Sequence, residues 1–156
     1  MWNVMVFAYG TLKTGLRNNY RFRHNNAKSL GTAYFETSEF VLCSGHSYPY
    51  AIRVNKEQFD ELIREGVDPV IQGELFEGPE SMIDDLDRFE GCPNLFLRQE
   101  VVVRADDSGG QSFNAWMYHK NGFLVSKDYV CCDGYWYPEL RGVSARQLSS
   151  VHDMRV

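Results

Sequence analysis

Apolar and β-branched residues fall into short runs along this chain, each bounded by glycine, proline or polar residues. Runs of this length and composition are typical of strands, and seven of them can be distinguished. The predicted strands cover residues 4–9, 29–35, 39–43, 50–54, 70–77, 97–104 and 112–119. The Asp/Ser/Gly-rich segment between the last two predicts a hairpin turn. The chain therefore has a mainly β framework.

One segment with helical spacing follows the fourth predicted strand. Asn55, with Gln58 three residues later, has the pattern of a capping box, and Gly66 suits the end of this helix. The polar segment 16–26 allows one further short helix. Because strands and helices do not alternate as repeating βαβ units, the sequence predicts a single α+β domain with about two main helices.

A second helix is predicted from Pro79, which suits a first helical position, to Phe89 or Glu90, where Gly91 closes it. Its apolar residues share one arc of the helix surface. They are Met82, Ile83, Leu86 and Phe89, while Asp84, Asp85, Asp87 and Arg88 fall outside this arc. Glu90 falls inside the same arc, so its carboxylate is aimed at the core side of the helix.

A carboxylate on the apolar face of a helix points to a functional role or an ion pair, because burying an unpaired charge costs free energy. Burial and the negative end of the helix dipole should both raise the pKa of Glu90, which suits a general base. Two other interpretations stay open at this point. In one the helix ends before Glu90, and in the other Glu90 forms an ion pair with Arg98 or Arg104.

The first predicted strand leads directly into the segment Tyr9–Leu12. Gly10 removes side-chain bulk there, so that backbone amides can point at a ligand. Successive N–H groups in such a turn form a concavity suited to a carboxylate or an oxyanion. A strand that simply ends in a glycine turn would give the same pattern. The interpretation of this segment as a binding loop is therefore supported only in combination with Glu90.

Composition narrows the class of protein. The 156 residues suit one domain, with a core at about 4–119 and a less defined aromatic tail at 120–156. The chain is 44% hydrophobic and 24% charged, with a formal net charge of −5. Its lysines and arginines are scattered, which argues against nucleic acid as a partner, and no apolar run is long enough to span a membrane. Without a signal-peptide pattern, we expect a cytoplasmic protein. The sequence predicts no oligomeric state.

The four cysteines and four histidines show neither metal-ligand spacing nor a CxxC pair. We therefore expect reduced thiols and no metal site. Cys92 lies close to Glu90 in the sequence, but no histidine is placed as its partner. A thiol enzyme is for that reason the weakest of the alternatives.

Several short segments, in order and with preserved spacing, resemble one known family. Phe7–Lys13 resembles the YGTL/YGSL loop of the γ-glutamylcyclotransferase-like superfamily, and Leu86–Pro93 resembles the LDxFE-x-CP segment that carries its catalytic glutamate. The remaining matches are Tyr48–Pro49, Gln72–Phe76 and Ala115–Tyr118. The Glu-x-Cys-Pro stretch is most similar to the γ-glutamylamine cyclotransferase branch.

This resemblance implies a compact barrel-like fold with a mixed sheet, about two flanking helices and one pocket. It implies that Glu90 is the catalytic base. The substrate-binding residues that it implies are Tyr9, Gly10, Thr11, Leu12 and Tyr118. A half-buried strand aromatic would account for Tyr118 equally well. The implied reaction needs no cofactor: the α-amine of a γ-glutamyl group attacks its own γ-carbonyl, which releases 5-oxoproline and an amine.

The implied partner is a small-molecule γ-glutamyl substrate whose leaving group is an amine. Phe96 stands where the branch has a tyrosine, and Phe96 and the aromatic tail Tyr135–Tyr137 are expected to border the exit for that amine. A γ-glutamyl amino acid, glutathione or a γ-glutamyl tailoring intermediate stays open as the substrate. The segment Lys13–Arg17 lacks the tryptophan- and arginine-rich stretch of the glutathione-specific branch. A non-catalytic binding module on the same scaffold also stays open.

Overall fold

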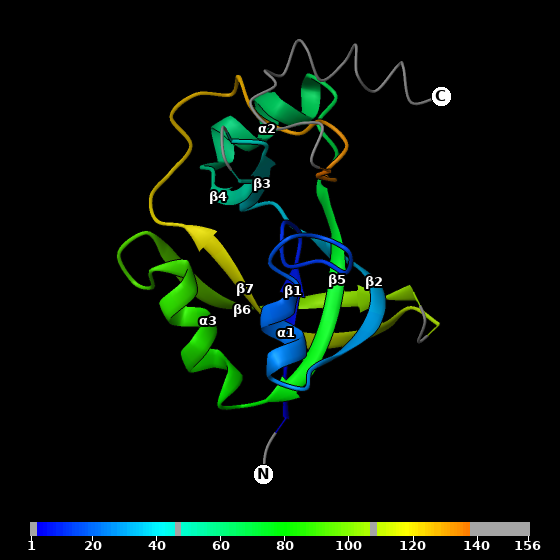
Figure 1. Cartoon of the computed structure of the whole chain (residues 1–156). Coiled ribbons are helices and arrows are strands. Elements are labelled where there is room, and N and C mark those ends of the chain that lie inside the picture. Colours follow the sequence, from blue (N-terminus) through cyan, green and yellow to red (C-terminus); the bar gives the residue numbers. More distant parts are fainter. Residues whose placement is uncertain (1–2, 46–47, 107–108, 138–156) are drawn as a thin grey trace.

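Five of the seven predicted strands close into a barrel, and the other two form a small separate sheet (Figure 1). The computed structural model describes residues 3–45, 48–106 and 109–137. The strands are β1 (Asn3–Ala8), β2 (Lys28–Glu36), β3 (Phe40–Cys43), β4 (Tyr50–Arg53), β5 (Val70–Pro79), β6 (Phe96–Ala105) and β7 (Gln111–Lys120). The helices are α1 (Tyr20–His24), α2 (Lys56–Arg64) and α3 (Met82–Glu90). The predicted α+β class with a barrel-like mixed sheet is confirmed, with three helices in the described residues instead of about two.

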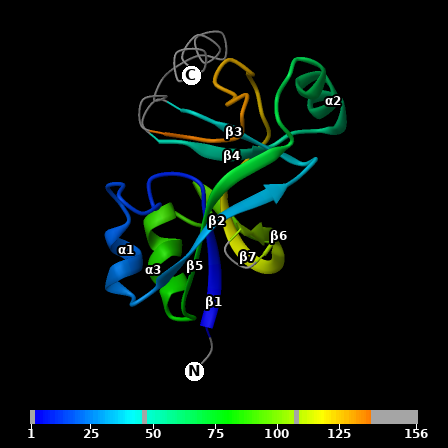
Figure 2. The same ribbon diagram turned by 90° about the vertical axis from the view of Figure 1, so that its right-hand side faces the viewer.

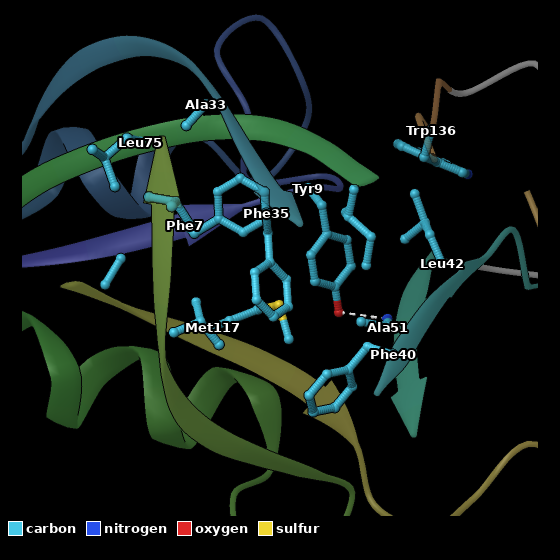
Figure 3. Close-up of a cluster of buried hydrophobic side chains, with 14 of the residues drawn as sticks. Phe7, Tyr9, Ala33, Phe35, Phe40, Leu42, Ala51, Leu75, Met117 and Trp136 are labelled. Atoms are coloured by element: carbon cyan, nitrogen blue, oxygen red, sulfur yellow. Dashed lines mark hydrogen bonds between the residues drawn. The ribbon is translucent and has the colours of Figure 1, made fainter. Parts of the chain in front are cut away.

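The barrel has the strand order β1-β5-β2-β6-β7, and β1 closes it. This strand pairs antiparallel with β5 along its whole length and parallel with β7 through Val6 and Trp116. Along β6, Val101 and Val103 are buried while Val102 between them is exposed, as the period of two in a strand requires. The inward side chains form one core, part of which is drawn in Figure 3.

Helices α1 and α3 lie side by side against the barrel (Figure 2). Phe22 of α1 stacks on Phe76 of β5, with ring centroids 4.0 Å apart. An ion pair of 3.6 Å between Arg21 and Asp85 joins the two helices. None of the helices in the described part of the chain is long and apolar enough to cross a membrane.

The prediction that the second helix begins at Pro79 is wrong. Strand β5 continues through Pro79, which pairs with Asn3 of β1, and α3 begins at Met82 after Ser81. A proline is tolerated at the end of a strand as well as at the start of a helix. The deciding factor is the pairing with β1, which lies far away in the sequence and leaves no local signal.

The small sheet of β3 and β4 lies at the other end of the molecule together with α2 (Figure 1). The predicted capping box is present at the start of α2. Asn55 Oδ1 accepts from the Gln58 amide at 2.8 Å, and Gln58 Oε1 accepts from the Asn55 amide at 3.0 Å. Gly66 follows the helix with a φ of +95°, a conformation that favours glycine.

The aromatic tail packs against the body as far as Tyr137. The Cys131 amide donates to the Leu42 carbonyl at 2.7 Å, and the Gln72 amide donates to the Gly134 carbonyl at 2.8 Å. The Trp136 side chain joins the barrel core and is only 1% exposed. This part of the tail is therefore structural, and the remainder of the predicted tail, 138–156, lies outside the described residues.

Trp136→Ala is expected to lower the free energy of unfolding by about 3–5 kcal/mol, because it empties a large volume inside the core. Val125→Ala, in the same tail but at a side chain that is 97% exposed, should change it by less than about 0.5 kcal/mol. Urea unfolding followed by circular dichroism measures both. Equal, small effects of the two substitutions would show that the tail is not part of the core.

Candidate active site

A cavity of about 300 Å³ opens where β1 leaves the barrel. Its walls come from the segment after β1, from the end of α3 and from β7. All six site residues predicted from the sequence line it, and they are Tyr9, Gly10, Thr11, Leu12, Glu90 and Tyr118. Segments far apart in the sequence therefore meet at one place. In the described residues, no group of three or more His, Cys, Asp or Glu side chains lies together as a metal site would require.

The end of α3 fixes the position of Glu90. Gly91 adopts the left-handed conformation (φ +66°), the Gly91 amide donates to the Arg88 carbonyl at 3.2 Å, and the Cys92 amide donates to the Asp87 carbonyl at 2.9 Å. These two bonds form a Schellman motif, which stops the helix directly after Glu90. The alternative in which the helix ends before Glu90 is therefore wrong.

The Glu90 carboxylate is held in an environment that favours its protonated form. Burial raises the pKa of Glu90 to about 7, although the positive charge of Arg21 acts in the opposite direction. No hydrogen bond or ion pair joins this carboxylate to another of the described residues. The alternative of an ion pair with Arg98 or Arg104 is wrong, because Arg98 pairs with Asp87 and Arg104 lies over the ring of Tyr34. A carboxyl group with a pKa near neutrality can accept and return a proton at physiological pH.

The segment Tyr9–Leu12 is held by its carbonyl groups. The Asn18 amide donates to the Thr11 carbonyl at 3.1 Å, and the Asn19 side chain donates to the Leu12 carbonyl at 2.8 Å. Asn18 also donates from its side chain to the Thr11 hydroxyl at 2.8 Å. The amides of Gly10, Thr11 and Leu12 donate to none of the described residues. Those N–H groups are the ones that a bound anion or a developing oxyanion would need.

Gly10 is required by a close approach. A Cβ atom at this position would lie 2.6 Å from Cγ of Pro49. Pro49 belongs to the aromatic-proline step that precedes β4 and also lines the cavity. The loop and this proline therefore fit together only because residue 10 has no side chain, a reason that the sequence pattern did not reveal.

The resemblance implied that Tyr9 binds substrate, but the Tyr9 hydroxyl is engaged in hydrogen bonds within the protein. This hydroxyl donates to the Tyr118 carbonyl at 2.7 Å and accepts from the Ala51 amide at 2.9 Å, the second bond being drawn in Figure 3. Burial raises the pKa of the Tyr9 hydroxyl well above its usual value, so the group stays neutral. The Tyr9 hydroxyl thus joins β1, β4 and β7, and what it offers the cavity is its ring and its main chain.

Tyr118 is linked to two residues that the sequence pattern did not single out as functional. Its hydroxyl donates to Oδ1 of Asp87 at 2.6 Å. Arg98 donates to the same carboxylate from Nε at 3.0 Å and from Nη2 at 3.2 Å. Burial opposes the ionised form of Asp87, but the bonds from Arg98 and Tyr118 outweigh it and hold its pKa below the usual value. In the helical projection Asp87 fell on the polar face, and only its spacing of three from Glu90 could have drawn attention to it.

Part of the cavity lining is apolar. Tyr48, Leu95 and Phe96 belong to it, and the rings of Tyr48 and Phe96 lie 5.9 Å apart. Phe96 therefore borders the cavity, and an exit for the leaving amine beside it stays a prediction. For the described part of the aromatic tail the expectation is wrong, since Tyr135–Tyr137 line a different cavity beside Lys13 and Glu74, while residues 138–156 lie outside the described residues.

Comparison with known proteins agrees with this fold. A sequence model of the family described as "Gamma-glutamyl cyclotransferase, AIG2-like" matches residues 6–138. Gamma-glutamylaminecyclotransferase A of Danio rerio is 30% identical over 122 residues, which cover 77% of this chain and 71% of the relative. Gamma-glutamylaminecyclotransferase of Mus musculus is 30% identical over 123 residues, covering 72% and 75%.

Two solved structures share the fold at lower identity. An AIG2-like protein from Mus musculus superposes with a TM-score of 0.70 at 22% identity, covering 88% of this chain and 90% of the other. YkqA from Bacillus subtilis gives 0.58 at 24% identity, covering 86% and 40%. With the family match spanning both the Tyr9–Leu12 segment and Glu90, the chain belongs to the γ-glutamyl cyclotransferase, AIG2-like family.

Proposed function

We propose that the protein is a cyclotransferase that converts a γ-glutamyl amine into 5-oxoproline and a free amine. The observation that carries this proposal is one cavity lined both by Glu90, whose pKa is raised to about 7, and by Gly10, Thr11 and Leu12, whose backbone amides donate to none of the described residues. The first group is suited to moving a proton, and the second is suited to stabilising negative charge.

The reaction requires a base because the nucleophile is an amine. An α-amino group has a pKa of about 8 and is largely protonated at neutral pH. Glu90 removes one proton, and the freed nitrogen lone pair attacks the γ-carbonyl carbon of the same molecule. The new C–N bond closes the five-membered ring, and the carbonyl oxygen becomes an oxyanion. The amides of Gly10, Thr11 and Leu12 bind that oxyanion.

Collapse of this intermediate breaks the original amide bond. The carbonyl re-forms as the leaving nitrogen takes the proton held by Glu90. The ring nitrogen, which still carries two hydrogens, then gives one of them through Glu90 to the departing amine, so that 5-oxoproline leaves together with an ammonium ion. Glu90 returns to its ionised form, so the cycle consumes no other reactant. The cavity contributes further by holding the flexible γ-glutamyl chain in a folded conformation that brings the nitrogen close to the carbonyl carbon.

The choice of an amine as leaving group rests on two supports. Two relatives with 30% identity, from Danio rerio and Mus musculus, are named gamma-glutamylaminecyclotransferases. The side of the cavity lined by Tyr48, Leu95 and Phe96 offers apolar surface to an alkyl chain beyond the scissile bond. Apolar contacts of this kind discriminate by only about 1–3 kcal/mol, so several γ-glutamyl amines should be accepted.

A substrate panel tests the proposal. We expect 5-oxoproline release from γ-glutamyl-ε-lysine and from simple γ-glutamyl alkylamines, with glutathione a poor substrate. The measurement is kcat/KM for each compound, with free γ-glutamyl amino acids included. A value for glutathione equal to or above that for γ-glutamyl-ε-lysine would overturn the choice of leaving group. If no γ-glutamyl compound yields 5-oxoproline, the non-catalytic binding module is the better interpretation.

A further inference from the structure

The hydrogen bond between Tyr118 and Asp87 has a fixed direction. Asp87 accepts two bonds from Arg98 and is ionised, so its carboxylate has no proton to give. The proton in the bond of 2.6 Å must therefore come from the Tyr118 hydroxyl. A phenol has only one such proton, and once it is committed to Asp87 the oxygen can only accept further bonds.

Tyr118 also lies in the wall of the cavity that contains the proposed base. The Glu90 charge acts on the Tyr118 hydroxyl electrostatically. Its ring is held on β7, and its own carbonyl is bonded by Tyr9, so neither end of the residue is free to move. The cavity thus has a fixed, neutral acceptor beside a carboxylate.

From this arrangement we infer that Asp87 and Arg98 are positioning residues, which keep Tyr118 as a hydrogen-bond acceptor for the α-amino group of the substrate. The inference rests on the proposed function and adds a role for three residues in it. In the ammonium form of the substrate, one N–H donates to Glu90 and a second donates to Tyr118. After Glu90 has taken its proton, the bond to Tyr118 still holds the nitrogen.

The direction of that bond matters for the chemistry. The amine attacks with its lone pair, which must point at the γ-carbonyl carbon. A tyrosine hydroxyl that was free to rotate could donate its proton to this lone pair and so block the attack. Because the Tyr118 hydroxyl proton is bonded to Asp87, it cannot do this. The Tyr118 oxygen instead accepts an N–H of the amine and so orients its lone pair toward the carbonyl carbon.

A second tyrosine in the chain provides a matched control. The Tyr34 hydroxyl donates to Oδ2 of Asp106 at 3.0 Å, and Arg104 lies over the Tyr34 ring at 5.7 Å. The same three residue types thus meet on an exposed surface of β2 and β6, away from the cavity. Tyr34→Phe and Asp106→Asn change the same groups and should leave kcat/KM within about twofold of the wild type.

The kinetic test uses Tyr118→Phe, Asp87→Asn and the double variant. Each single substitution is expected to lower kcat/KM about 10- to 100-fold, as loss of a hydrogen bond to a charged group does. Because Asp87 acts through Tyr118, the double variant should be no more than about twofold worse than the poorer single variant. Both substitutions conserve volume, and thermal melts establish that the variants are folded.

A binding test separates this inference from the proposed function. L-Glutamate and glutarate differ only in the α-amino group. Calorimetry should show that the wild type binds L-glutamate more tightly than glutarate. Tyr118→Phe should raise the dissociation constant of L-glutamate by about tenfold or more and leave that of glutarate unchanged. This result does not depend on turnover of any substrate.

Three results would overturn the inference. The first is a kcat/KM for Tyr118→Phe within twofold of the wild type. The second is a double variant whose loss equals the product of the two single losses, which would show that Asp87 acts independently of Tyr118. The third is equal binding of L-glutamate and glutarate to the wild type, or an equal effect of Tyr118→Phe on both. Absence of 5-oxoproline from every substrate would instead count against the proposed function.

Discussion

Glu90→Gln is expected to lower kcat by at least about 10²-fold while leaving the protein folded. The amide keeps the size of the side chain and the Schellman motif at Gly91, but it cannot take a proton from the substrate. Initial rates of 5-oxoproline release measure the effect. Glu100→Gln makes the same chemical change at an exposed position of β6 and should leave kcat unchanged. Turnover near that of the wild type in a folded Glu90→Gln variant would show that another group is the base.

The pH dependence gives a second measurement of the same residue. A base acts in its ionised form, so kcat/KM should rise with pH through about 7, the pKa to which burial raises Glu90. Below this pH the rate should fall about tenfold per pH unit, and this limb should be absent from the residual activity of Glu90→Gln. An acid limb near pH 4.5 would instead indicate a solvent-exposed carboxylate.

Gly10→Val is expected to lower kcat/KM by on the order of 10²-fold, the range found when one oxyanion donor is lost. The added side chain would occupy the space of Pro49 Cγ, 2.6 Å from the Cβ position, so the loop or the proline must move. Either movement displaces the amides of the Tyr9–Leu12 segment. The measurement is kcat/KM for γ-glutamyl-ε-lysine, with a thermal melt to establish that the variant is folded.

Thr11→Ser is the matched control within the same loop. Serine keeps the hydroxyl that accepts from the Asn18 side chain, and it leaves the main chain in place. Activity within about threefold of the wild type is expected. If Gly10→Val and Thr11→Ser have similar effects, the backbone amides of this segment do not bind the oxyanion.

The helix that carries Glu90 shows what a sequence can reveal. Helical spacing placed one carboxylate among apolar neighbours, and this local pattern was enough to single out Glu90 as a candidate base. The same projection placed Asp87 on the polar face. Its partners, Arg98 and Tyr118, come from β6 and β7, and no local pattern encodes which strands lie beside a helix.

Errors in the elements have the same origin. Pro79 suited a helix start by local preference, but pairing with β1 extended the strand through it. The tail after Asn121 carried no periodic signal, because its segment up to Tyr137 is held by single hydrogen bonds and by the burial of Trp136. Both features depend on long-range contacts, whereas the capping box at Asn55 depends on residues three apart and was predicted correctly.

The pairing of β1 also has a consequence for synthesis on the ribosome. This strand is made before the other strands of the barrel, yet its partners are β5 and β7, and the hydrogen bond from Tyr9 to Tyr118 spans 109 residues. A nascent chain that has reached Glu90 already contains the candidate base and the Tyr9–Leu12 segment, but not the strand that supplies the opposite wall. Translation adds about 5–20 residues per second, so β1 waits for seconds before the barrel can close. The cavity between these segments can therefore form only after β7 has left the exit tunnel.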